Sequence, residues 1–327
     1  MSNLYICIFF CTFAGDLENS KTMNFTHLHV HSHYSVLDGM SKISDLVDKC
    51  IRTGMPAIAL TDHGNMYGIK EFLDYSKKAN GQLKAAAEEK GETFIPFKPI
   101  VGIEAYCARR GRLMQDKDYK VTNGEGKTQV VDMSGWHLIL LAKNKTGYQN
   151  LCRLTSLSFI DGFYRTARID KELLAECREG LICSSACLGG EISQKVMEGL
   201  LQSASLPFEE RFKAAIEAAK WFKSIFGEDY YLEIQRHQTD KEGADQMVYQ
   251  KQKDVNEVLV EIAKRLDSIP LQSNNVVSNT LESIPQIAYI SNEAAIQLYK
   301  KLGFIEAGIR KNFYEKPREN AIFMWKR

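Results

Sequence analysis

The chain has 327 residues, of which 44% are hydrophobic and 25% are charged, so it can bury a substantial core as one large domain plus a smaller piece. A formal net charge of +1 excludes a global electrostatic attraction to nucleic acid. A secreted disulfide scaffold and a membrane protein are also excluded, because the eight cysteines form no paired framework and the apolar amino-terminal run is too short to span a bilayer; both features predict a cytoplasmic location.

Short apolar segments alternate with segments of helical period along most of the chain. In chain order, the predicted strands are 25–30, 57–61, 99–106, 136–142, 181–184 and 231–235. The predicted helices are 41–52 with Ser41 as N-cap, 68–78, 147–157, 190–199, 208–226 and 255–266. Because parallel strands need crossover connections, this alternation predicts a parallel sheet covered by helices. The expected fold class is α/β, most simply an α/β barrel or a related layered fold.

Histidines recur where these predicted strands end. His29 and His31 are alternate residues of an extended segment, so their side chains share a face about 7 Å apart along the backbone. In folds of this class, functional groups gather at the carboxyl ends of the strands, and His63 follows the second strand. Any one of these residues alone is more simply an ordinary buried or surface histidine. Their recurrence at one structural position favours a metal site.

Other donor residues accompany the histidines. Asp38 lies in the loop after the first pair, Glu104 comes late in the third strand, and Cys187 follows the fifth. His137 is an exception, because it stands near the start of its strand. Imidazole, carboxylate and thiolate groups together suit zinc, and oxygen-rich positions also admit manganese or iron. Such ions lower the pKa of bound water and clamp a phosphate ester, which favours phosphoester hydrolysis.

Several motifs occur in the order typical of one family. They are HLHVHSHYSVLDG, ALTDHGNMYGIKEF, PIVGIEAY, HLILLAKNKTGYQNLCRLTS, GFYRTARIDKELL, CLGGEI and YLEIQRH. Residues 23–271 resemble the amino-terminal PHP (polymerase and histidinol phosphatase) domain of bacterial replicative DNA polymerase III alpha subunits. The resemblance implies a distorted (β/α)7 barrel with a metal cluster at the strand ends.

The resemblance also implies roles for individual residues. The expected metal ligands are His29, His31, Asp38, His63, Glu104, His137 and Cys187. His27 and Asp62 are expected to orient a ligating imidazole from behind. His237 belongs to the family's pattern too, but a buried, hydrogen-bonded histidine is as good an interpretation as a ligand.

The chain departs from the family after residue 271. The family continues with a strand that ends in an Asp and a His of the metal site, whereas Asn275 and Val277 stand near those positions here. Asn275 has no anionic oxygen and Val277 has no donor atom. The expectation is an incomplete cluster that holds one or two Zn²⁺ or Mn²⁺ ions weakly, in a barrel that lacks its last strand.

The carboxyl-terminal segment resembles a second family. Residues 291–327 are similar to the end of a GCN5-related N-acetyltransferase of the type that acetylates a ribosomal protein's amino terminus, which implies roles for Asn292 and Tyr299 beside acetyl-coenzyme A. No glycine-rich phosphate loop precedes this segment, which disfavours acetyl-coenzyme A binding. The simpler alternative is an amphipathic helix over 293–302 followed by a hairpin.

Two further segments complete the expected organisation. The polar stretch 272–290 is expected to be a linker, which favours a fused or frameshifted reading frame. Residues 1–22 have no counterpart in the family, so a misread upstream start codon is the favoured account, a weak anchor is the alternative, and Met23 is the expected functional start.

The predicted function follows from the polymerase resemblance. The chain is expected to be the PHP portion of a DNA polymerase III alpha subunit with residual metal-dependent phosphoesterase or 3′–5′ exonuclease activity, whose partners are DNA and the other polymerase III holoenzyme subunits. No segment resembles the polymerase active site, so the chain is not expected to copy DNA unaided. The alternatives are a non-catalytic scaffold that binds the proofreading subunit and, less favoured, an N-acetyltransferase.

Overall fold

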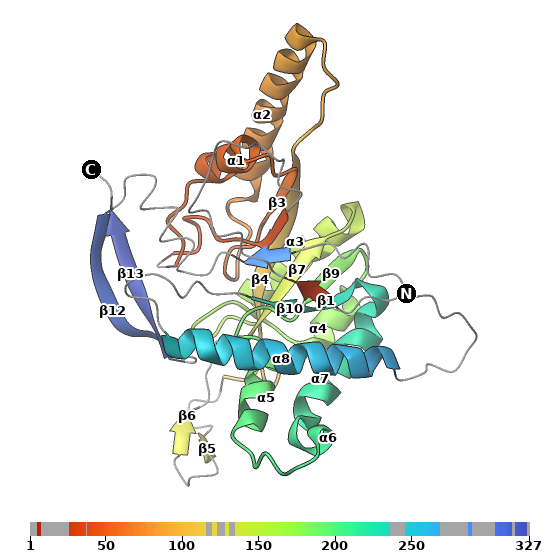
Figure 1. Cartoon of the computed structure of the whole chain (residues 1–327), viewed down its shortest axis with the longest axis vertical. Helices are drawn as coiled ribbons and strands as arrows, with labels where there is room; N and C mark the ends of the chain where they lie inside the picture. The colour runs from red at the N-terminus through yellow and green to blue at the C-terminus, as the bar shows by residue number, and fades with distance from the viewer. Residues whose placement is uncertain are drawn as a thin grey trace, which may run out of the picture.

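A computed structural model describes residues 5–7, 26–36, 38–115, 120–122, 128–130, 135–235, 246–268, 287–289, 305–315 and 318–325. Within these ranges, one curled open sheet is covered by helices (Figure 1). The strands of this sheet are β1 (Tyr5–Cys7), β2 (Thr26–His29), β3 (Ala57–Leu60), β4 (Lys98–Cys107), β7 (Trp136–Ala142), β8 (Arg168–Ile169), β9 (Leu181–Ser184), β10 (Tyr230–Ile234) and β11 (Ile287–Tyr289). The predicted α/β class is confirmed.

The helices are α1 (Ile43–Arg52), α2 (Ile69–Lys90), α3 (Lys145–Ile160), α4 (Lys171–Glu176), α5 (Glu191–Leu200), α6 (Phe208–Arg211), α7 (Lys213–Phe226) and α8 (Gln246–Ser268). α2, which projects from the sheet in Figure 1, is longer than predicted because strong helix formers continue to Gly91, where a left-handed φ of 65° ends the helix. The helix predicted over 208–226 divides at the buried Phe212. The predicted N-cap Ser41 is wrong, since Lys42 occupies that position without a side-chain cap.

The strand order is β1, β10, β9, β7, β4, β3, β2, β11, and β8 pairs with β4. The expectation of a parallel sheet is wrong at one strand, because β7 pairs antiparallel with both β4 and β9. The sequence does not show this reversal, since an apolar run has the same pattern in either direction. At the two ends of the sheet, β1 pairs parallel with β10, and β11, from within the expected linker, pairs parallel with β2.

Alternate residues of the central strands face different parts of the core. On β7, Leu138 and Leu140 belong to the larger buried cluster, which packs against α3, α5, α7 and α8. Ile139 and Leu141 belong to a small cluster on the opposite face, together with Ala59 of β3. A third cluster packs α1 and α2 against β3. The same alternation leaves His137 on the face of Ile139 and Leu141.

Outside the main sheet, β5 (Lys120–Thr122) pairs with β6 (Thr128–Val130), and β12 (Ile305–Glu315) pairs with β13 (Arg318–Trp325), both antiparallel. Among the described residues, no helix combines the length and the apolar character that crossing a bilayer requires.

Candidate metal centre

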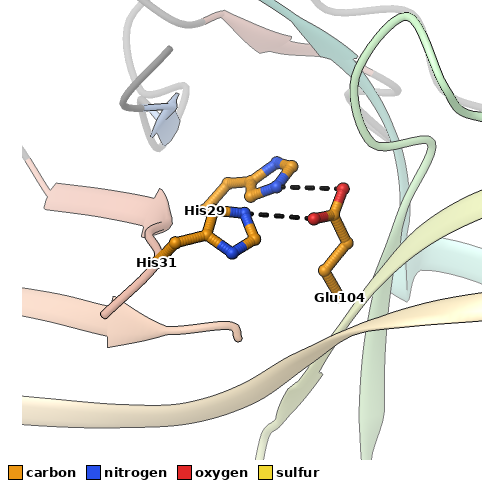
Figure 2. Close-up of side chains that lie close together, drawn as sticks. All are labelled: His29, His31 and Glu104. Atoms are coloured by element: carbon orange, nitrogen blue, oxygen red, sulfur yellow. Dashed lines mark ion pairs between the residues drawn. The ribbon is translucent and has the colours of Figure 1, made fainter. Parts of the chain in front are cut away.

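The buried carboxylate of Glu104 lies at the middle of the candidate centre. Its Oε1 atom is 3.2 Å from Nε2 of His29 and 2.9 Å from Nδ1 of His137. Its Oε2 atom is 3.0 Å from Nε2 of His31 and 2.7 Å from Nδ1 of His63. Figure 2 shows His29 and His31 presenting their Nε2 atoms to the two oxygens. Glu104 therefore divides the surrounding imidazoles into two pairs, one at each carboxylate oxygen.

Two further predicted residues lie at the edge of this arrangement. A carboxylate oxygen of Asp38 is 2.8 Å from Nε2 of His63. The Sγ atom of Cys187 is 3.4 Å from Nδ1 of His137 and 3.7 Å from Oε1 of Glu104. The structure thus places all seven predicted ligand residues together, with Cys187 on the His137 side and Asp38 on the His63 side.

The position of His137 follows from the direction of β7. Because β7 is antiparallel to β4, its first residues lie beside the last residues of β4, with His137 opposite Tyr106 and Ile139 opposite Glu104. The start of this strand therefore lies at the edge where the parallel strands β2 and β3 end. The antiparallel direction of β7 therefore explains why His137, near the start of its strand, lies beside the other histidines.

The rings of His29 and His31 are each held by a hydrogen bond on the side that faces away from Glu104. Nδ1 of His29 is 2.8 Å from Oε1 of Glu233, a buried residue of β10. Nδ1 of His31 is 2.8 Å from the Ser35 hydroxyl oxygen, and the Ser35 hydroxyl donates to Asp62 at 2.6 Å. Ser35 therefore lies between Asp62, for which an orienting role is predicted, and the ring of His31. In both cases Nδ1 is engaged and Nε2 faces Glu104.

Asp62 also organises the loop that carries His31. One of its carboxylate oxygens accepts from the backbone N–H of Ser32, and the other accepts from the Ser32 hydroxyl. The Ser35 hydroxyl additionally accepts from the backbone N–H of His63. This polar network fixes the spacing between the loop after β2 and the loop after β3.

Tyr106 forms a wall beside the centre. Its ring stacks on that of His63, with centroids 5.8 Å apart and planes at 12°, and meets His137 edge-on at 5.3 Å. Gly64 permits this packing: its φ is 62°, and a Cβ atom there would lie 3.0 Å from the Tyr106 ring. A glycine at this turn keeps both the left-handed backbone and the ring contact.

The charges of the centre are strongly coupled. Burial opposes ionisation of Glu104, but the surrounding histidines, His63 first, hold the pKa of its carboxyl well below the usual value. Burial also disfavours the charged form of His29, yet Glu104 and Glu233 outweigh it and raise the pKa of His29 to about 9. The pKa of His63 is likewise well above normal because of Glu104, whereas burial and the charge of His63 lower the pKa of His31.

The donor set fits a divalent transition metal. Three groups of side chains each bring candidate ligand atoms within 4.8 Å of one another: His29 with His31 and Glu104, His31 with Asp38 and His63, and His63 with Glu104 and His137. Imidazole nitrogens and carboxylate oxygens are the donors that zinc and manganese take. The three groups share His31, His63 and Glu104.

The structure does not test the roles predicted for several other residues. His27 lies on β2 opposite Ile58 of β3, and its outer role stays a prediction. His237, Asn275, Val277, Asn292 and Tyr299 lie outside the described residues. Neither the loss of the Asp and His ligands nor the acetyltransferase resemblance is therefore tested by the structure.

Sequence reasoning missed two contributors. Glu233 interrupts the otherwise apolar strand YYLEI, much as Glu104 interrupts PIVGIEAY, so an acidic residue inside a buried strand was the available signal. Ser35 had no comparable signal, because a serine in a polar loop is ordinary.

Comparison with known proteins gives one consistent family. The PHP domain profile matches residues 27–237. DNA polymerase III subunit alpha of Borreliella burgdorferi is 41% identical over 251 residues, which are 77% of this chain and 18% of that protein. The same subunit of Chlamydia pneumoniae is 36% identical over 78% of this chain and 18% of its own length, and that of Thermus aquaticus is 38% identical over 74% and 16%.

The chain thus spans about a fifth of the length of the curated relatives that it matches. A solved structure titled as a putative metal-dependent phosphoesterase from Bifidobacterium adolescentis shows a distant likeness, with a TM-score of 0.33 and 14% identity over 75% of this chain and 85% of the other.

Proposed function

The chain belongs to the PHP domain family, and on this premise we propose that it is the PHP portion of a bacterial DNA polymerase III alpha subunit with a metal-dependent phosphoesterase centre. The observation that carries the proposal is the convergence of imidazoles on both oxygens of the buried Glu104. A buried carboxylate surrounded by histidines has no obvious value as packing, because each polar group carries a desolvation cost. Ligation of a metal ion by these side chains would account for their burial together.

Within this proposal, the two oxygens of Glu104 would each contribute to holding a metal ion. His29, His137 and Cys187 serve the side of Oε1, and His31, His63 and Asp38 serve the side of Oε2. The thiol and imidazoles of the first side favour zinc, and the carboxylate of Asp38 lets the second side accept manganese as well. A divalent ion held there supplies an activated water and offsets the charge of a phosphate ester.

The protein side chains have separate tasks in phosphoester hydrolysis. Glu104 keeps its negative charge at neutral pH, because its pKa is held well below normal. Tyr106 packs against His63 and His137 and limits the positions that their rings can take. Nucleic acid ends are the proposed substrates, with 3′–5′ exonuclease action as the specific form, since the relatives are named as polymerase subunits.

Metal analysis of the purified full chain tests the proposal. We expect wild-type protein to retain zinc or manganese, and His31→Ala and Glu104→Ala to lose most of it. His33→Ala is the matched control, because His33 is an exposed histidine of the same loop. Hydrolysis of a chromogenic phosphodiester and of end-labelled single-stranded DNA should follow metal content. Equal metal content in all four proteins would overturn the proposal.

One observation favours a scaffold as the second candidate function. Asn275 and Val277 are expected to stand near the positions of two further family ligands, and neither side chain can replace those ligands. A chain with a weakened cluster would hold the polymerase together and bind the proofreading subunit without catalysis. Stable binding to that subunit by metal-free protein, with no hydrolysis at saturating Mn²⁺, would support this role. An N-acetyltransferase role is third, and calorimetric titration with acetyl-coenzyme A tests it.

A further inference from the structure

The carboxylate of Glu233 occupies the space behind His29. The residue is 1% exposed and comes 204 residues after His29 in the chain. Its Oε1 atom lies 2.8 Å from Nδ1 of His29 and also accepts from the side-chain amide of Gln235 at 2.9 Å. Its Oε2 atom accepts from the hydroxyl of Ser184. Both oxygens are therefore engaged by donors in a site that is closed to solvent.

We propose that Glu233 is a positioning residue that fixes His29 as an Nδ1–H donor and so commits Nε2 of His29 to the metal. This inference rests on the proposed function. A neutral imidazole has one N–H donor and one acceptor nitrogen, and a carboxylate can only accept. Both ring nitrogens of His29 face a carboxylate, but Nδ1 is 2.8 Å from Glu233 whereas Nε2 is 3.2 Å from Glu104, so the single proton of the neutral ring resides on Nδ1. The lone pair then resides on Nε2, which faces Oε1 of Glu104 at 3.2 Å.

Glu233 also connects His29 to the opposite side of the centre. Ser184 ends β9, three residues before Cys187, and the backbone N–H of Glu233 donates to Ser185 at 2.8 Å. One buried side chain thus joins the end of β2, the end of β9 and β10. A shift of this carboxylate would move both His29 and the turn that carries Cys187.

The structure supplies an internal comparison for this role. His31 is held in the same way, with Nδ1 toward the Ser35 hydroxyl and Nε2 toward Glu104. The Ser35 hydroxyl in turn donates to Asp62. A carboxylate therefore contacts Nδ1 of His29 directly, whereas the Ser35 hydroxyl lies between a carboxylate and Nδ1 of His31. Direct contact with a carboxylate raises the basicity of the metal-facing nitrogen more than contact with a hydroxyl does. Glu233 accordingly makes His29 the stronger ligand of the two.

The test compares Glu233→Gln, Glu233→Ala and Ser184→Ala in the full chain. Ser184→Ala is the matched control, because it removes one partner of Glu233 and leaves the carboxylate beside His29. We expect Zn²⁺ affinity to fall about 10- to 100-fold in Glu233→Ala, less in Glu233→Gln, and least in Ser184→Ala. Cobalt substitution should show altered absorption bands only in the two Glu233 variants.

Nitrogen-15 NMR of the histidine side chains provides a readout that needs no metal. Above the pH at which the chemical shifts show that the His29 ring has lost its charge, wild-type and Ser184→Ala proteins should show the Nδ1–H tautomer of His29, and Glu233→Ala should show a mixture. An Nε2–H tautomer in the wild type, or no tautomer change in Glu233→Ala, would overturn the inference. If no protein binds metal while the tautomer behaves as expected, the proposed function fails and the positioning role of Glu233 stands.

Discussion

Nδ1 of His63 lies 2.7 Å from Oε2 of Glu104, although the two residues come from different strands of the sheet. The same His63 ring reaches Asp38 through its other nitrogen at 2.8 Å, so it is held between two carboxylates. Such a contact keeps His63 protonated in the metal-free protein, because its pKa is raised well above normal. Protons and metal ions therefore compete for the same nitrogen atoms.

The first prediction concerns the pH dependence of metal binding. Imidazoles must lose their protons before they ligate a metal. Because the pKa of His29 is raised from 6.5 to about 9 and that of His63 is also raised, apparent Zn²⁺ affinity should increase between pH 6.5 and 9. Competition against a chromophoric chelator at pH 6.5, 7.5 and 8.5 measures this, and a flat profile would contradict it.

The second prediction concerns the stability of the metal-free protein. A histidine whose pKa is higher in the folded state stabilises the fold fully below its ordinary pKa of 6.5, and this contribution is lost as pH rises through the folded value. Melting temperatures recorded in the presence of a chelator should therefore fall between pH 6.5 and about 9. In a Glu104→Gln variant, which lacks the main charge that raises these pKa values, the slope over this window should be smaller.

At acidic pH the sign is reversed for Glu104. Its folded pKa lies well below the ordinary 4.5, so its contribution is present above pH 4.5 and is lost as pH falls toward the folded value. The contributions of Glu104, His29 and His63 are accordingly all present between about pH 4.5 and 6.5, whereas the lowered pKa of His31 opposes them as pH falls below 6.5. A melting-temperature maximum above pH 8 in chelator would contradict the assignments of His29 and His63, and unchanged stability between pH 4.5 and 3 would contradict that of Glu104.

The third prediction concerns the support of His31. Ser35→Ala removes the hydroxyl that links Asp62 to Nδ1 of His31. Zn²⁺ or Mn²⁺ affinity should fall about 10- to 100-fold, as is typical when a group behind a metal ligand is lost. Ser156→Ala is a suitable control, because the Ser156 hydroxyl donates to a backbone carbonyl on the exposed side of α3. Equal affinities in the two variants would show that the Ser35 bond is dispensable.

The fourth prediction tests how the fold positions Glu104. A Cβ atom at Gly102 would lie 2.5 Å from a methyl carbon of Leu141 and 2.8 Å from the carbonyl oxygen of Leu140. The backbone oxygen belongs to the paired strand and cannot yield, so Gly102→Ala should destabilise the protein by about 1–3 kcal/mol. Because Gly102 lies two residues before Glu104 on the same face, metal binding should weaken as well.

Gly81→Ala is the control for that prediction, because it is expected to change the stability in the opposite direction. Gly81 lies within α2, and a Cβ atom there would meet nothing within 4 Å. Alanine at this position should stabilise the helix by about 0.5–1 kcal/mol. Chemical denaturation of both variants measures the difference, and destabilisation by Gly81→Ala would indicate a contact that the structure does not contain.

Much of the fold was predictable because the elements carry local signals. The strand over 136–142 and the strand over 181–184 were predicted with the bounds that the structure has. The reversal of β7 was not predictable, since strand direction depends on which neighbours it pairs with. The position of His137 depended on that reversal, so its place in the centre rested on family resemblance alone.

The metal centre likewise contains residues that local sequence patterns predict and residues that they do not. Histidines at strand ends were visible in the sequence because they recur at comparable positions. Glu233 was not assigned, because its role depends on a contact with His29 across 204 residues of sequence, which no local pattern encodes. The serine of the Asp62 network was missed for the same reason: a hydroxyl becomes significant only through its partners.

The centre joins residues that are widely separated along the chain, from His29 at the end of β2 to Cys187 after β9. An ion that binds both residues in the folded protein and leaves the unfolded chain would stabilise the fold, and would do so more strongly at higher free metal concentration. Folding yield during protein synthesis should therefore depend on the free metal concentration in the cell, even if the bound ion performed no chemistry.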